Sequence, residues 1–251
     1  MNKKLIIANW KMNPDSLARA NQILEAIDGH LELLADRNFS LVICPPFVFL
    51  EEVSRMLKTS RLGQSALLGA QDITPEDSGG LTGEISGPML TSLDVRYVII
   101  GHSERRWKMN ESDEVANLKL KAALRNSITP IVCFGERERD ARSKDFLREQ
   151  VANTLEGLSE DEKEKCIVAY EPVWAISTTP GSHPDSLGGA LESMGVIHEL
   201  MPQAKILYGG SIDAGNAQGF LSQEGINGVL VGGASIRTEE FLKILTIVAK
   251  L

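Results

Sequence analysis

The stretch Ala169-Tyr170-Glu171-Pro172-Val173-Trp174-Ala175-Ile176 decides how the rest of this 251-residue chain is interpreted. It begins as the end of an apolar run at 166–170, which predicts a buried strand. Glu171 follows where that strand should end, and Pro172 restricts it to an extended backbone. Apolar side chains then continue towards Pro180-Gly181. We interpret Glu171 as a catalytic base at the start of a loop that can cover it and exclude water. The alternative is a surface carboxylate beside a packed apolar loop.

Short apolar runs of this kind recur along the whole chain. Most of them lack polar alternation, which is typical of strands buried on both faces of a parallel sheet. Segments with apolar residues at helical spacing fill the gaps, as in Leu17, Ala20, Leu24, Ile27 and Leu31. The apolar runs lie at 5–8, 41–44, 66–70, 95–100, 130–134, 167–170, 206–208 and 228–231.

This alternation of strands and helices decides the fold class. Eight strand-then-helix units in 251 residues predict an α/β protein, specifically a (β/α)8 barrel. A doubly wound sheet would place Gly-x-Gly-x-x-Gly after its first strand, where this chain has Asn9-Trp10-Lys11-Met12-Asn13. No linker rich in Pro, Gly or Ser divides the sequence, so residues 1–251 are predicted to form one domain.

Composition limits the classes of partner. The chain is 43% hydrophobic and 24% charged, as in ordinary globular proteins, and its net charge of −8 argues against nucleic acid or an anionic membrane as a partner. Its apolar runs are shorter than the ~18 residues that a membrane span needs, and the N-terminus does not resemble a signal peptide. Cys44, Cys133 and Cys166 have no metal-ligand spacing, so we expect neither disulfides nor zinc and predict a reducing cytoplasm.

Polar residues and glycine pairs follow the predicted strands, at the barrel end where catalytic groups lie. Gly209-Gly210-Ser211 and Gly232-Gly233 follow the last two strands, where barrels commonly bind phosphate and where glycine lets backbone N–H groups approach an anion. The alternative is that each glycine pair only forms a tight turn and binds no phosphate. His102 could instead be a core histidine, and Lys11 a solvated surface lysine. The coincidence of both residues with Glu171 at strand ends argues against these alternatives. The remaining strand-end residues are Asn9, Lys11, Gln71, His102, Ser103, Glu104, Glu136 and Glu171.

Longer motifs surround these strand-end residues. They are Ala8-Asn9-Trp10-Lys11-Met12-Asn13, Gly69-Ala70-Gln71-Asp72, Thr82-Gly83-Glu84-Ile85-Ser86, Ile100-Gly101-His102-Ser103-Glu104-Arg105-Arg106, Val132-Cys133-Phe134-Gly135-Glu136, the 169–176 stretch, Tyr208-Gly209-Gly210-Ser211 and Val231-Gly232-Gly233-Ala234-Ser235. In this order, they resemble the triosephosphate isomerase family along nearly the whole chain. The resemblance implies a barrel enzyme of glycolysis and gluconeogenesis that uses no cofactor and no metal. Such an enzyme interconverts dihydroxyacetone phosphate and D-glyceraldehyde 3-phosphate through an enediolate.

The resemblance also implies catalytic roles. Glu171 would remove a carbon-bound proton and return it to the neighbouring carbon. Lys11 would stabilise the charge that develops on oxygen, and His102 would donate a hydrogen bond as a neutral ring. Asn9 would orient the lysine and the substrate, and Glu104 would support the histidine.

Substrate binding is implied in the same way. Asn9 and Lys11 would contact the substrate, and its phosphate would be bound at Ser177, Ser211, Gly232 and Gly233. Ser103 would hold Glu171 when the base is swung out, and Cys133 would lie buried behind the base.

Family members are usually homodimers in which the loop carrying Thr82 reaches Asn9 and His102 of the neighbouring subunit, so we expect a homodimer. The chain departs from the family pattern at Ser177-Thr178-Thr179-Pro180, Gly80-Leu81 and Trp107-Lys108-Met109-Asn110. Two other hypotheses remain open: an isomerase of four-carbon ketose phosphates, and a sugar-phosphate-binding protein that has lost catalysis.

Overall fold

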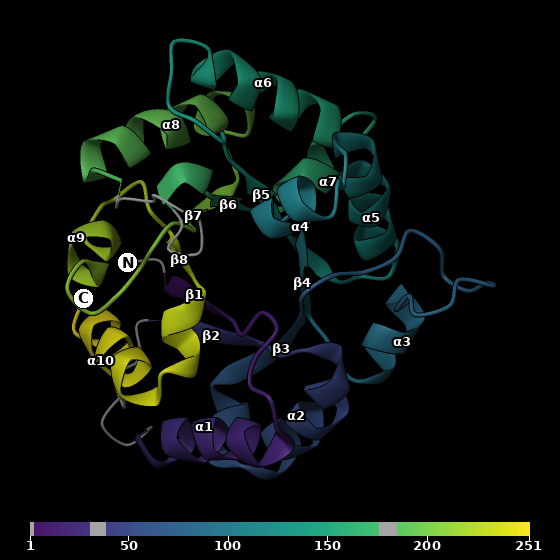
Figure 1. Ribbon diagram of the computed structural model, residues 1–251, viewed down its shortest axis with the longest axis vertical. Helices are drawn as coiled ribbons and strands as arrows, with labels where there is room; N and C mark the ends of the chain where they lie inside the picture. Colours follow the sequence, from purple (N-terminus) through teal and green to yellow (C-terminus); the bar gives the residue numbers. More distant parts are fainter. Residues whose placement is uncertain (1–2, 31–38, 176–184) are drawn as a thin grey trace.

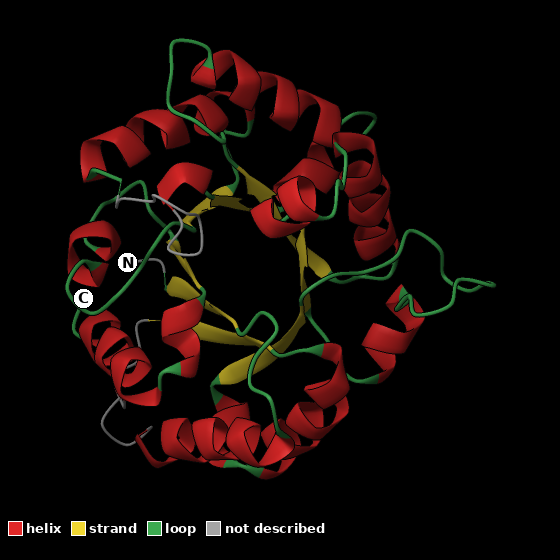
Figure 2. Ribbon diagram, in the orientation of Figure 1, coloured by secondary structure: helices red, strands yellow, loops and turns green. Residues whose placement is uncertain are grey.

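The computed structural model describes residues 3–30, 39–175 and 185–251. Eight parallel strands pair in sequence order, and β8 pairs with β1 to close a barrel. Helices surround this ring of strands (Figures 1 and 2). The predicted α/β barrel is confirmed. The strands are β1 (Lys4–Asn9), β2 (Phe39–Cys44), β3 (Ala66–Ala70), β4 (Tyr97–Ile100), β5 (Thr129–Phe134), β6 (Ile167–Tyr170), β7 (Lys205–Tyr208) and β8 (Gly228–Val231).

Serine side chains begin several of the helices. Ser86, Ser112, Ser159 and Ser186 each accept a hydrogen bond from a backbone N–H of the first turn, which satisfies a donor that the helix itself cannot pair. The helices are α1 (Leu17–His30), α2 (Phe47–Thr59), α3 (Gly87–Ser92), α4 (Ser103–Lys108), α5 (Asp113–Arg125), α6 (Ser143–Thr154), α7 (Glu160–Glu164), α8 (Leu187–Leu200), α9 (Ala217–Leu221) and α10 (Thr238–Ala249), with 3-10 turns η2 (Arg61–Gln64), η3 (Val173–Ala175) and η4 (Gly233–Ile236).

The strands contribute to two separate apolar clusters. On β1, Leu5 and Ile7 belong to a small cluster inside the barrel, whereas Ile6 and Ala8 belong to the larger cluster beneath the helices. Successive strand residues point to opposite faces, and both faces are buried here. This explains why the apolar runs carry no polar alternation.

Barrel closure depends on a glycine at the start of β8. A Cβ on Gly228 would lie 1.9 Å from the backbone oxygen of Leu5, so any larger residue would push β8 away from β1. The predicted strand at 95–100 begins only at Tyr97 in the structure. Val95 instead donates its N–H to Leu90 O, and Asp94 has a φ of 62°, so the preceding residues form the turn after α3.

The loop before α3 projects from the ring of helices (Figure 1). Within the described residues, no helix combines the length and the apolar character that crossing a membrane requires. The single-domain organisation of residues 1–251 stays a prediction.

Candidate functional site

The carboxyl ends of the strands surround a cavity of about 150 Å³. Lys11, which follows β1, Glu171, which follows β6, and His102, which precedes α4, all line it. Parallel strands in a barrel end at one face, so residues far apart in the sequence meet there. The other lining residues are Gly209, Gly210, Ser211, Ile212, Asp213, Leu230, Gly232, Gly233, Ala234 and Arg237.

The Glu171 carboxylate is almost completely buried, with 2% of the residue exposed. Its backbone N–H donates to Phe134 O at 2.7 Å, which holds it against the end of β5. A Cβ on Gly135 would lie 1.8 Å from Glu171 O, so the glycine permits this approach. The backbone N–H of Ser103 donates to Glu171 Oε2 at 2.8 Å, and His102 Nε2 lies 3.0 Å from Oε1. Both carboxylate oxygens therefore face the start of α4.

Two opposing effects set the pKa of Glu171. Burial raises it, while His102, the Ser103 N–H and the charge of Lys11 lower it; together these lowering effects win, so the pKa lies below that of an ordinary glutamate. The side chain is therefore an ionised carboxylate near neutral pH. A base must be ionised to accept a proton, so Glu171 is in the required state.

The tautomer of His102 follows from the start of α4. His102 precedes the helix, and its Nδ1 accepts a hydrogen bond from the backbone N–H of Glu104 at 3.2 Å. A ring nitrogen that accepts has no proton, so the neutral ring carries its proton on Nε2. That Nε2–H group faces Glu171 and the cavity. His102 can therefore donate to a substrate oxygen without being charged.

Lys11 is fixed at several points. Its ammonium lies 2.9 Å from Glu104 Oε1, its N–H donates to Asn9 Oδ1 at 3.0 Å, and its backbone oxygen accepts from Gln71 Nε2 at 2.9 Å. Its φ of 54° is a strained conformation for a lysine, and strain of this kind concentrates at functional sites. Burial raises the pKa of Glu104, but Lys11, His102 and Lys108 together lower it by more, so it lies below the ordinary glutamate value. Glu104 is therefore ionised and pairs with the Lys11 ammonium.

The two glycine segments leave backbone donors unused. In the part of the chain that the structure describes, the N–H groups of Ser211, Gly232 and Gly233 donate to no protein acceptor. Ser211 Oγ donates to Ala175 O at 2.9 Å, which ties the end of β7 to the turn after Glu171. Three unpaired N–H groups lining one cavity form an anion-binding arrangement.

The predicted site residues thus come together, with one exception. Asn9, Lys11, His102, Glu104, Glu171, Ser211, Gly232 and Gly233 lie in or beside the cavity. Ser177 lies outside the described residues. Cys133 is buried, and burial together with the charge of Glu171 raises its pKa, so it is an inert thiol.

Sequence reasoning missed three contributors. Arg237 lines the cavity, Gln71 holds the Lys11 backbone, and Arg106 Nε donates to Gly101 O at 2.7 Å, directly before His102. Gln71 was recognised as a strand-end residue but received no role. Arg237 could have been suspected as a cation four residues after Gly233.

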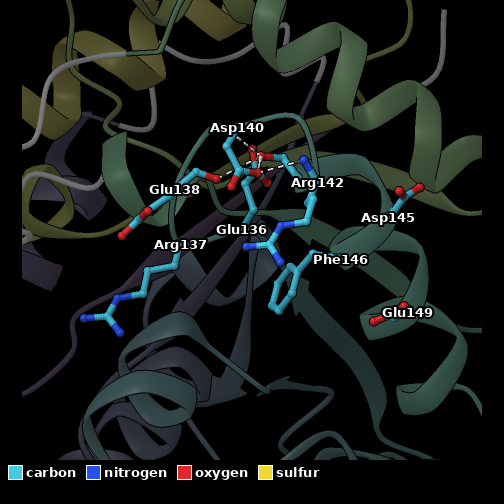
Figure 3. Close-up of a pocket in the computed structure, with 9 residues that line it drawn as sticks. Glu136, Arg137, Glu138, Asp140, Arg142, Asp145, Phe146 and Glu149 are labelled. Carbon is cyan, nitrogen blue, oxygen red and sulfur yellow. Dashed lines mark hydrogen bonds between the residues drawn. The ribbon is translucent and has the colours of Figure 1, made fainter.

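A second, larger hollow of about 540 Å³ lies beside the β5–α6 loop (Figure 3). Glu136, Arg137, Asp140, Arg142 and Phe146 are among its lining residues. It contains none of the residues predicted to act on a substrate. Its carboxylates and guanidinium groups are mixed, whereas the smaller cavity combines an ionised base with unpaired donors. We therefore take the smaller cavity as the candidate site.

Comparisons with known proteins agree with this geometry. The sequence model of the family described as "Triosephosphate isomerase" matches residues 4–248. The triosephosphate isomerase of Caldanaerobacter subterraneus subsp. tengcongensis is 38% identical over 254 residues, covering 98% of this chain and 99% of the relative. That of Dictyoglomus thermophilum is 39% identical over 260 residues, covering 98% and 99%. The crystal structure of triosephosphate isomerase from Bartonella henselae superposes with a TM-score of 0.82, at 33% identity and covering 98% of each chain. The chain belongs to the triosephosphate isomerase family.

Proposed function

We propose that this chain interconverts dihydroxyacetone phosphate and D-glyceraldehyde 3-phosphate, as a glycolytic and gluconeogenic isomerase with no cofactor. The observation that carries this is the convergence of an ionised Glu171, an Nε2-protonated His102 and the Lys11 ammonium on one cavity with unpaired backbone N–H groups. Family membership supports the same reaction.

Proton transfer is the first task of the site. Glu171 removes a proton from the carbon beside the substrate carbonyl, and the electron pair moves to the carbonyl oxygen to form an enediolate. Glu171 then returns the proton to the former carbonyl carbon, and the hydroxyl proton of the other carbon passes to the former carbonyl oxygen, which exchanges ketone and aldehyde. A positioned base contributes roughly 10²–10⁴-fold to such a step.

Stabilising the enediolate is the second task. The Nε2–H of His102 donates to the substrate oxygens, and the Lys11 ammonium places a positive charge beside them. Both groups are fixed before substrate arrives. The Glu104 N–H orients the His102 ring. Asn9, Gln71 and the Glu104 carboxylate hold Lys11. Donors that are already oriented need no reorganisation during the reaction, so they stabilise the developing charge effectively.

Binding of the phosphate group is assigned to the glycine segments. The N–H groups of Ser211, Gly232 and Gly233 are available to donate to an anion, and glycine leaves the backbone open to it. The backbone N–H of Ser177 remains a predicted fourth donor outside the described residues.

The test combines two measurements on the purified protein. Turnover of D-glyceraldehyde 3-phosphate is followed in a coupled assay, in parallel with a four-carbon ketose phosphate. Deuterium incorporation from solvent at the substrate carbon reports proton abstraction directly. Turnover of the triose with deuterium exchange supports the proposal. A preference for the tetrose, or phosphate binding without exchange, would favour one of the two other hypotheses.

We also propose a homodimer in the cytoplasm. The loop before α3 projects from the barrel, and residues 76–84 in it are all exposed (Figure 1). An exposed loop that carries Thr82 is suited to docking on a second copy. The three cysteines are buried free thiols, which fits a reducing compartment.

Changing Gly80 to Asp tests the dimer. The added charge should weaken a contact at this loop, so sedimentation should show monomer and kcat should fall with it. A folded monomer with the full kcat would contradict the functional dimer.

A further inference from the structure

Two cations flank the Gly232-Gly233 backbone. A Cβ placed on Gly232 would lie 3.0 Å from Lys11 Cε and 3.5 Å from its Nζ. A Cβ placed on Gly233 would lie 3.6 Å from Arg237 Nη1. An ammonium therefore reaches over the first glycine and a guanidinium over the second. Both side chains line the cavity that holds the unpaired N–H groups.

The two cations differ in what else they bind. Lys11 is paired with Glu104 at 2.9 Å, and the mechanism proposed above assigns its charge to the reacting oxygens. Arg237 is exposed, and its side chain makes no hydrogen bond, ion pair or ring contact with the residues that the structure describes. The nearby carboxylates are engaged elsewhere, because Asp213 accepts from the N–H groups of Gly215 and Asn216 and Glu240 accepts from that of Ala214. The guanidinium is thus available to an anionic ligand.

The charge of the protein makes this cation important. The chain carries a net charge of −8, and Glu171 and Asp213 both line the same cavity. A phosphate monoester carries about two negative charges near neutral pH. Without a further cation, the substrate would enter a cavity whose lysine is already neutralised by Glu104. An arginine presents several N–H donors in one plane, which suits a phosphate better than a point charge.

We propose that Arg237 is a specificity-determining residue: its guanidinium binds the substrate phosphate together with the N–H groups of Ser211, Gly232 and Gly233. This inference rests on the phosphate site proposed above. Arg237 lies beside Gly233 in that cavity, so the contact we propose is with the phosphate and not with the reacting carbons. It therefore selects phosphorylated over unphosphorylated substrates without altering proton transfer.

The experiment compares wild type with Arg237→Ala, Arg237→Lys and Lys243→Ala. Lys243 is an exposed cation on α10, the helix that begins directly after Arg237, so its removal changes the net charge equally but outside the cavity. The readouts are KM and kcat for D-glyceraldehyde 3-phosphate, the inhibition constant of inorganic phosphate, and deuterium exchange into unphosphorylated D-glyceraldehyde.

Arg237→Ala should raise KM and the phosphate inhibition constant by roughly fivefold to tenfold, as for one partly solvated charge-assisted contact. Exchange into D-glyceraldehyde should stay within about twofold of wild type, because that substrate has no phosphate. Arg237→Lys should recover part of the affinity, and Lys243→Ala should change none of these values. If Arg237→Ala behaves like Lys243→Ala, or if it impairs both substrates equally, the inference is overturned.

Amide chemical shifts separate this inference from the phosphate site itself. Titrating wild type with inorganic phosphate should shift the amides of Ser211, Gly232 and Gly233. If these amides do not respond, the proposed site is wrong and the Arg237 inference fails with it. If they respond with the same dissociation constant in wild type and Arg237→Ala, the phosphate site stands and the role of Arg237 is refuted.

Discussion

Replacing Gly209 with Ala tests how tightly the position of Glu171 is controlled. Gly209 follows β7, and its N–H donates to Tyr170 O at 2.7 Å. A Cβ at this position would lie 2.9 Å from Glu171 Cγ and 3.2 Å from Tyr170 O. Ordinary carbon contacts are about 3.5–4.0 Å. The new methyl group must therefore displace the base by roughly half an ångström or more.

The displacement acts on a side chain that has little freedom. The Ser103 N–H and His102 hold the two carboxylate oxygens, so a push from Gly209 disturbs those contacts or tilts the carboxylate. A misplacement of about 1 Å can cost roughly 10²-fold in rate. We therefore expect Gly209→Ala to lower kcat about 10–100-fold, which is ~1.4–2.7 kcal/mol in the barrier. KM should change less than about threefold, because the phosphate donors are untouched.

The assay measures kcat and KM with D-glyceraldehyde 3-phosphate, with thermal unfolding as a check on the fold. Gly195→Ala on α8 is the control, because a Cβ there meets nothing within 4 Å. That change should leave kcat unchanged and raise stability slightly, since alanine favours helix by up to ~1 kcal/mol over glycine. A folded Gly209→Ala enzyme with kcat within twofold of wild type would refute the reasoning.

Three further outcomes are expected. Glu171→Gln removes the base while keeping the side-chain shape, so isomerisation should fall at least roughly 10²-fold while inorganic phosphate still binds; turnover within tenfold of wild type would show that another group is the base. Lys119 lies 2.8 Å from Asp72 and also pairs with Glu111, so Lys119→Met leaves these two carboxylates with the guanidinium of Arg105, which lies 2.8 Å from each. Urea unfolding should then register a loss of about 1.5–3 kcal/mol, as for lost hydrogen bonds to charged groups, and a loss no larger than that of Lys121→Met on the same helix would contradict this. Since the folded-state pKa of Glu171 is lowered, its ionised form stabilises the native state above the ordinary glutamate pKa, and this stabilisation is lost as pH falls through the lowered pKa. The stability difference between wild type and Glu171→Gln should therefore shrink in acid, and a difference that grows would reverse the sign of the shift.

The barrel and the strand-end residues could be predicted because they depend on local pattern. Most strand residues are buried on both faces, with exceptions such as Leu67 of β3, so the strands are marked by apolar runs and polar residues follow their ends. The fourth strand shows where the pattern fails. Val95 is apolar and buried, yet it belongs to the turn after α3. A buried turn residue and a buried strand residue are both apolar, so the sequence does not distinguish them.

The remaining parts of the site depend on side-chain direction, which sequence spacing does not encode. The tautomer of His102 follows from a helix beginning at the next residue, so its own Nδ1 receives an N–H. The role of Gln71 requires β2 and the Lys11 turn to lie side by side, since its amide donates to Cys44 O as well as Lys11 O. Arg237 reaches the cavity because η4 turns the chain back over Gly233.

The contacts of Glu171 also indicate how a buried carboxylate can be a weak base before substrate binds and a stronger one afterwards. Burial raises its pKa, and His102, the Ser103 N–H and the charge of Lys11 lower it. In the proposed mechanism, the Nε2–H of His102 donates to a substrate oxygen, so substrate competes with Glu171 for this group. A carboxylate that shares this donor loses part of its stabilisation but stays buried. Its affinity for a proton then rises when a proton must be removed, because the donor that faced the base now stabilises the enediolate.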